Sequence, residues 1–87
     1  MTNNELAKKY VYNTRKWKKL RKYHIQNNPL CAECLKHGML KSADQVHHIT
    51  PFIEGKNLEQ IIFLAFDPKN LQSLCHDCHK KKHQKNV

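Results

Sequence analysis

The segment of sequence that decides the fold runs from residue 70 to residue 83. It reads Asn-Leu-Gln-Ser-Leu-Cys-His-Asp-Cys-His-Lys-Lys-Lys-His. Residues 71–74 predict a short strand, and the segment from Cys78 to about Gln84 predicts a helix. Between them lie Cys75 and Cys78, and two intervening residues let one tight turn present both thiolates to a metal ion. The segment therefore predicts a strand and a helix joined at a metal-binding turn.

An earlier cysteine pair, Cys31-Ala-Glu-Cys34, has the same spacing. Paired C-x-x-C turns in a reducing compartment are typical of zinc sites, whose four ligands are tetrahedral. Two disulfides or a redox C-x-x-C are the alternatives, but no thioredoxin-like βαβ pattern surrounds either pair. We therefore predict one structural Zn²⁺ bound by Cys31, Cys34, Cys75 and Cys78. Such a site supplies about 10–16 kcal/mol of apparent binding energy, which a small core needs.

Size and charge limit the class of protein. The chain has 87 residues, 39% of them hydrophobic, which indicates one domain. Sixteen Lys and Arg against seven Asp and Glu give a net charge of +9, which indicates a polyanionic partner. A merely solubilising surface or anionic lipid is the alternative, but no amphipathic membrane helix is apparent. No apolar run approaches the ~20 residues of a membrane span, so we expect a soluble intracellular protein without membrane contact.

The first half of the chain predicts a polar lead and a basic helix. Residues 1–13 form the lead, and residues 14–28 the helix, with Thr14 as N-cap and Asn28-Pro29 as its end. Trp17, Leu20 and His24 fall on one face of this helix. The opposite face carries the basic residues Arg15, Lys18, Lys19 and Lys22. A solvated surface and a phosphate-contacting surface explain these residues about equally well, and Arg21, on the apolar side, is left unassigned.

The middle of the chain predicts a strand followed by a helix. His37-Gly38 marks a turn, and residues 43–50 predict a strand that Pro51 ends. Asn57 resembles an N-cap, and Gln60 completes a capping-box pattern. The apolar residues from Leu58 to Phe66 then follow a helical period, although a buried strand over 61–66 is the competing interpretation.

The seven histidines are distinctive in their placement. His79 and His83 are four residues apart, so on a helix they project from one face and can converge on a metal ion. His47 and His48 are adjacent in the predicted strand. On a regular strand they would point to opposite faces, so both reach one substrate only if the strand is twisted or bulged.

Taken in order, these motifs resemble the HNH endonucleases, in particular the small zinc-containing HNH proteins of bacteriophages and prophages. The resemblance covers residues 15–83 and is carried by Val46-His-His-Ile49, Asn70-Leu-Gln-Ser-Leu-Cys75 and Cys78-His-Lys-Lys-Lys-His83. It implies an α+β chain with a ββα-metal fold over residues 31–83, a four-cysteine zinc site and an N-terminal helix, all in one domain over 1–87. Relatives often have Asp-His where this chain has His47-His48, which leaves the preferred metal open.

The resemblance also implies roles for individual residues. His48 would be the general base, and Asn70 would orient it. His47 and His79 would bind a catalytic divalent ion, which is Mg²⁺, Mn²⁺, Ni²⁺ or Zn²⁺. His83 would either complete the metal site or donate a hydrogen bond to phosphate. DNA phosphates would be held by the basic residues Arg15, Lys18, Lys19, Lys22, Lys80, Lys81 and Lys82.

The predicted function is metal-dependent DNA cleavage, as nicks or double-strand breaks, with weak sequence preference. The resemblance suggests a monomer or weak dimer in the cytoplasm of a bacterial host, with phage terminase or packaging proteins as possible partners. A catalytically silent zinc module that binds DNA or protein is the alternative. The intact set of His47, His48, Asn70 and His79 favours the enzyme.

Overall fold

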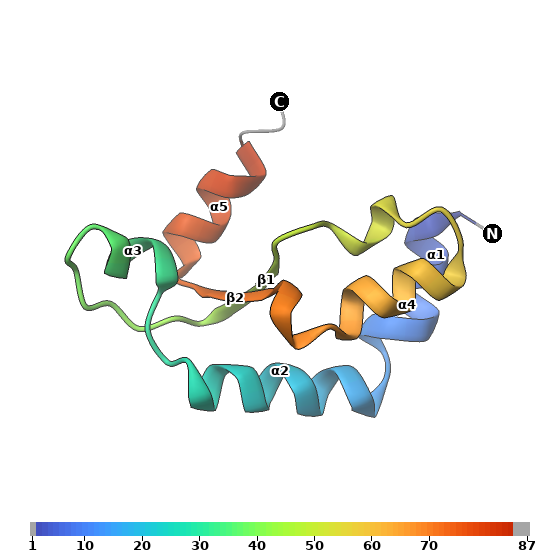
Figure 1. Ribbon diagram of the computed structural model, residues 1–87, viewed down its shortest axis with the longest axis horizontal. Helices are drawn as coiled ribbons and strands as arrows, with labels where there is room; N and C mark the ends of the chain where they lie inside the picture. Colours follow the sequence, from blue (N-terminus) through green and yellow to red (C-terminus); the bar gives the residue numbers. More distant parts are fainter. Residues whose placement is uncertain (1, 85–87) are drawn as a thin grey trace.

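The computed structural model describes the backbone of residues 2–84 and the side chains of residues 2–82. Five α-helices, one π-helix and two 3-10 helices surround a two-stranded sheet (Figure 1). In chain order the elements are α1 (Asn3–Ala7), η1 (Lys8–Tyr12), α2 (Arg15–Asn27), α3 (Ala32–Lys36), β1 (Gln45–His48), η2 (Phe52–Glu54), α4 (Leu58–Phe66), η3 (Pro68–Asn70), β2 (Leu71–Leu74) and α5 (His76–Gln84). Among these described residues, no helix is long and apolar enough to cross a membrane.

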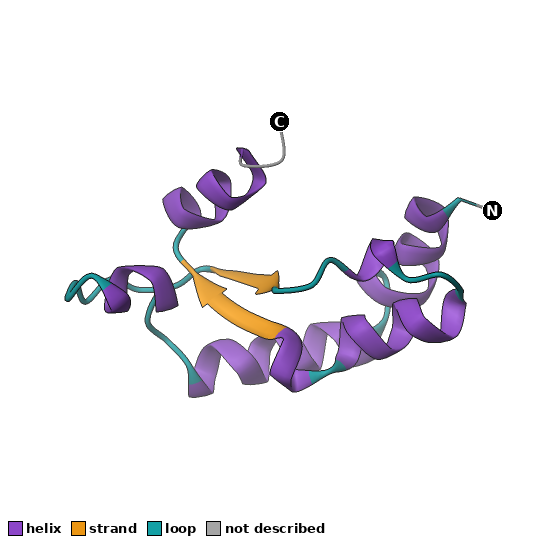
Figure 2. Cartoon of the chain, turned by 45° about the horizontal axis from the view of Figure 1, so that its top comes forward, coloured by secondary structure: helices purple, strands orange, loops and turns teal. Residues whose placement is uncertain are grey.

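The sheet is antiparallel and its register is regular. His47 pairs with Gln72, and His48 pairs with Leu71. Paired residues of neighbouring strands share a face, and successive residues alternate between faces. His48 stacks on Trp17 of α2, and Leu71 shares a core with Trp17, whereas His47 lies against α5. Figures 1 and 2 show α2 along one side of the sheet and α5 rising from the other.

The basic helix forms where the sequence predicts it. The Thr14 hydroxyl accepts a hydrogen bond from the Trp17 amide at 3.2 Å, which satisfies one of the free N–H groups of the first turn. Trp17 is buried beneath the helix and is part of the main core. The helix ends at Asn27, before the predicted Asn28-Pro29 stop.

The helix α4 settles the competing interpretations of residues 58–66 in favour of helix. Asn57 is its N-cap, and the Asn57 Oδ1 accepts from the Gln60 amide at 2.9 Å. The capping box is incomplete, because the Gln60 side chain accepts from the Lys56 amide and not from Asn57. The strand predicted over 43–50 is shorter and covers Gln45–His48.

The N-terminal lead is helical, which the sequence analysis did not predict. A capping box between Thr2 and Glu5 begins α1, and η1 continues it. Ala7 and Val11, one turn apart, are fully buried in the main core with Ile61 of α4. Thr2 and Glu5 have the capping-box spacing, a local signal that the interpretation of this segment as a polar lead overlooked, and tertiary packing stabilises so short a helix.

Two separate cores hold the molecule together. The main core lies between η1, α2, η2 and α4 and includes Trp17, Phe52 and Leu71. The second core consists of the cysteine turns and Leu74. Because β2 contributes Leu71 to one core and Leu74 to the other, this strand connects the zinc-type site with the main body.

Candidate active site and metal centre

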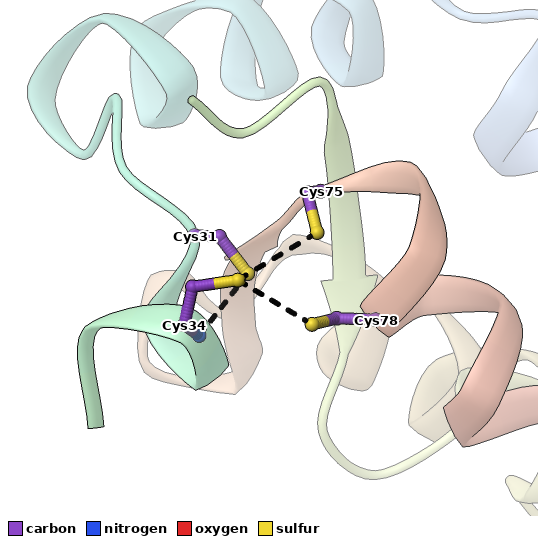
Figure 3. Close-up of side chains that lie close together, drawn as sticks. All are labelled: Cys31, Cys34, Cys75 and Cys78. Carbon is purple, nitrogen blue, oxygen red and sulfur yellow. Dashed lines mark hydrogen bonds between the residues drawn. The ribbon is translucent and has the colours of Figure 1, made fainter. Parts of the chain in front are cut away.

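The four cysteine sulfurs converge at the far end of the sheet. Cys31 and Cys34 come from the turn that begins α3, and Cys75 and Cys78 come from the junction of β2 and α5 (Figure 3). All four Sγ atoms lie within 4.8 Å of one another. The Cys34 sulfur is 3.9 Å from that of Cys75 and 3.7 Å from that of Cys78. A tetrahedral zinc ion with Zn–S bonds of ~2.3 Å needs sulfurs roughly 3.8 Å apart, so these residues fit the ion.

These sulfur separations exclude disulfides, whose bonds are about 2.05 Å long. Burial and the neighbouring Cys31 sulfur raise the pKa of the Cys34 thiol. Burial also raises the pKa of Cys31, but hydrogen bonds from Cys34 and Cys75 outweigh it and lower this pKa to about 6. The thiols therefore differ, and a bound cation favours the ionisation of all four by compensating their charge. The cluster is organised for a metal ion, as the cysteine spacing predicts.

A cavity of about 410 Å³ lies along the free edge of β1. All four residues of β1 line it, together with residues of α2, η2 and α5, and none of its lining residues belongs to β2. The lining residues include Trp17, Arg21, His47, His48 and His79. The two strand histidines alternate between faces and still share this cavity, because it extends around an unpaired edge. The register of the strand is regular, without a bulge, and whether the strand twist brings both rings to one phosphate stays a prediction.

His48 is held rigidly on the α2 side of the cavity. Its ring stacks on Trp17, with centroids 5.0 Å apart, and meets the edge of Phe52 at 4.6 Å. The Nε2 atom lies 3.0 Å from the Ala65 carbonyl oxygen. Because a carbonyl oxygen only accepts, Nε2 carries the hydrogen of the neutral ring and Nδ1 keeps a lone pair. Burial lowers the pKa of His48, and the hydrogen bond to Ala65 opposes this change only partly. The imidazole is therefore neutral at pH 7 and able to accept a proton.

His47 and His79 approach each other on the α5 side of the cavity. Their ring centroids are 5.7 Å apart and their planes are 79° apart. Two imidazoles bound to one ion through nitrogens at ~2.1 Å have centroids roughly 4.6–5.3 Å apart, so the rings would need to approach each other by a few tenths of an ångström to share a divalent ion. The side chain of His83, predicted as a third ligand, lies outside the described residues.

Asn70 is buried and does not line the cavity, and its side-chain hydrogen bonds go to Thr50 and Leu64 rather than to the His48 ring. Its Nδ2 donates to the Thr50 and Leu64 carbonyl oxygens, each at 2.9 Å, and its Oδ1 accepts from the Thr50 amide at 2.8 Å. These bonds connect the segment after β1 to the end of α4. Leu64 precedes Ala65, whose carbonyl holds His48, so Asn70 is placed to position that carbonyl through the backbone.

We expect Asn70→Ala to lower the free energy of unfolding by about 2–5 kcal/mol, because it leaves three backbone groups of Thr50 and Leu64 without a partner. Urea unfolding of the zinc-loaded protein measures this loss. Lys69→Ala, at the exposed neighbouring position, should unfold near the wild-type midpoint. Equal midpoints for the two variants would contradict the positioning role of the amide.

The predicted DNA-contacting residues fall into two groups. On α2 the exposed basic residues are Arg15, Lys18, Lys19 and Lys22, and none of them lines the cavity. On α5, Lys80 and Lys81 are exposed beside His79. Lys82 is instead 3.2 Å from the Glu33 carboxylate, and this pair helps lower the pKa of Glu33. Lys82 therefore joins α5 to the first cysteine turn.

Arg21 is a cavity residue that the sequence analysis did not assign. Its Nη2 donates to the Asp44 carbonyl oxygen at 3.0 Å, and its side chain lines the cavity with the three histidines. The sequence does indicate this position: Arg21 follows Trp17 by four residues, so both side chains lie on one face of α2.

A second cavity of about 370 Å³ lies between the end of α2, the turn before α3 and β2. His24 and Ser73 line it, and the His24 Nε2 and Ser73 Oγ atoms are buried without a hydrogen-bond partner among the described residues. With one imidazole and no carboxylate or thiol in its lining, this cavity lacks a ligand set for a metal ion.

Comparison with known proteins agrees with this arrangement. The profile of the HNH endonuclease family matches residues 31–85. This chain belongs to the HNH endonuclease family. The HNH endonuclease of the deep-sea thermophilic bacteriophage GVE2, whose crystal structure contains a manganese ion, is similar in fold, with a TM-score of 0.81. It is 33% identical, over 97% of this chain and 85% of that chain. A comparison with functionally curated proteins finds no match.

The HNH fold is thus confirmed. Its ββα unit consists of β1, β2 and α5, and the cysteine cluster lies where β2 passes into α5. His47, His48 and His79, for which the sequence predicts roles in catalysis and metal binding, line the cavity beside that unit. The chain is therefore an HNH endonuclease, a phosphodiester hydrolase that acts on DNA.

Proposed function

We propose that this HNH endonuclease hydrolyses DNA with His48 as general base, His47 and His79 as ligands of a divalent ion, and the cysteine cluster as a structural zinc site. One observation carries the proposal. The buried, neutral His48 donates through Nε2 to Ala65 and keeps Nδ1 free to accept a proton, in the same cavity as the His47–His79 pair.

In this proposal His48 removes a proton from the attacking water through Nδ1. The Ala65 carbonyl and the Trp17 stack hold the ring in one tautomer and one orientation, so little reorganisation accompanies proton transfer. His47 and His79 fix the position of the ion. When bound, a divalent ion supplies Lewis acidity at the scissile phosphate and the leaving oxygen. Asn70 acts indirectly, through the backbone that holds His48.

DNA binding is proposed to depend on charge and to carry weak sequence preference. The exposed basic residues of α2 and α5 contact the backbone, and such contacts position DNA without specifying sequence. The similarity to a bacteriophage HNH endonuclease supports a phage setting. We also propose a role beside DNA packaging, with terminase or packaging proteins as partners, in the cytoplasm of an infected host.

Cleavage of supercoiled plasmid by zinc-loaded protein tests this function. We expect cleavage only after Mn²⁺, Mg²⁺ or Ni²⁺ is added, at sites scattered over the plasmid. Nicked and linear products distinguish single-strand from double-strand cutting. If about six phosphates are neutralised, DNA affinity should fall roughly 10³-fold between 50 and 200 mM salt. Binding without cleavage under every metal condition would instead identify a silent zinc module.

A further inference from the structure

Apart from the divalent ion proposed for His47 and His79, one residue supplies the fixed charge of the active-site cavity. Among the described residues that line it, Arg21 alone carries a permanent charge, and no carboxylate lines the cavity. The three histidines beside it are uncharged in the state that binds metal or accepts a proton. A phosphodiester that enters the cavity therefore meets a single fixed positive charge from the protein itself.

The position of Arg21 is set by two elements. It lies one helical turn after Trp17, and Trp17 stacks on His48, so α2 presents the arginine and the base on one side. The Asp44 carbonyl, just before β1, holds Nη2 at 3.0 Å. An arginine has five N–H donors, so this bond leaves others for a ligand, and a neutral carbonyl leaves the charge uncompensated.

We propose that Arg21 binds the scissile phosphate, which the water deprotonated by His48 attacks, and so is a substrate-binding residue of the cavity. The inference rests on the proposed function, since it deepens the same site. A guanidinium forms two parallel hydrogen bonds with phosphate oxygens, which fixes orientation as well as charge. The α2 basic residues Arg15, Lys18, Lys19 and Lys22 do not line the cavity and contact DNA outside it.

The competing explanation is structural. Arg21 could serve only to tie α2 to the segment before β1 through Asp44. A tie of this kind affects stability and leaves the phosphate contacts unchanged, so the two explanations differ in DNA binding and its salt dependence.

The experiment compares Arg21→Gln with Lys69→Gln, a control that removes the same charge from an exposed position outside the cavity lining. Binding of a fluorescent DNA duplex is measured by anisotropy at several salt concentrations, without added divalent ion. Zinc content and melting temperature are recorded for each variant. We expect Arg21→Gln to bind roughly 10- to 100-fold more weakly than Lys69→Gln, because a charged hydrogen-bond pair is lost. Its slope of log affinity against log salt should be smaller by about 0.9.

A third variant keeps the inference testable if Arg21→Gln unfolds. Arg21→Lys keeps the charge and a donor for Asp44, so the salt slope should stay near wild type while turnover at saturating Mn²⁺ falls. Wild-type binding, slope and turnover in the Arg21 variants would overturn the inference and leave only the tie to Asp44. If the wild-type protein binds DNA but cuts none, the proposed function fails, and the binding comparison still decides whether Arg21 contacts phosphate.

Discussion

His48→Ala is expected to reduce turnover about 10²–10⁴-fold, because it removes the proposed general base. The ring is buried between Trp17 and Phe52, so alanine also removes packing and should lower the melting temperature. Turnover is therefore measured below the melting temperature of the variant, with saturating Mn²⁺ and full zinc occupancy.

Two further variants separate chemistry from packing. His48→Phe keeps an aromatic ring against Trp17 and offers no proton acceptor, so it should be as inactive as alanine and more stable. His37→Ala removes an exposed imidazole outside the cavity and should retain wild-type turnover. An active His48→Phe enzyme would show that His48 serves packing alone.

Cys75→Ser is expected to abolish zinc binding and unfold the domain. The apparent binding energy of a structural zinc site is about 10–16 kcal/mol, which equals or exceeds the whole stability of a typical domain, about 5–15 kcal/mol. Cys75 is only 3% exposed and lies between the end of β2 and the start of α5. Its cluster forms the second core of the molecule, together with Leu74. Metal analysis and circular dichroism measure both losses.

His76→Ser is the matched control for this change. It makes a polar substitution at the exposed neighbouring position and should retain one zinc per chain and the wild-type melting temperature. A Cys75→Ser protein that loses zinc and melts at the same temperature as His76→Ser would refute the structural role of the metal. Cobalt in place of zinc should give the absorption of a tetrahedral thiolate site.

Features with local signals could be predicted from the sequence. The N-cap Thr14, the N-cap Asn57 and the helical period after it each act within one or two turns, and all three appear in the structure. The cysteine spacing likewise predicts a convergent cluster, because each turn presents two thiolates regardless of the rest of the fold.

Features that depend on distant contacts could not be predicted. Ala7 and Val11 are buried only because α4 packs against them, so their burial had no signal in composition. The shared cavity of His47 and His48 depends on the unpaired edge of β1, and the place of Arg21 depends on where α2 crosses that edge. The ion pair between Lys82 and Glu33 likewise depends on the fold, because the two residues belong to different elements, α5 and α3.

We propose that His47 and His79 bind the divalent ion on which cleavage depends. This ion is distinct from the structural zinc of the cysteine cluster. Chelators cannot test this cleanly, because they also remove zinc from the cysteine cluster. The direct measurement is plasmid cleavage in Mn²⁺ by the His47→Ala/His79→Ala double variant, whose zinc content and melting temperature match the wild type. We expect a folded, zinc-loaded protein that still binds DNA and leaves the plasmid supercoiled. Cleavage at the wild-type rate by that protein would contradict the proposal.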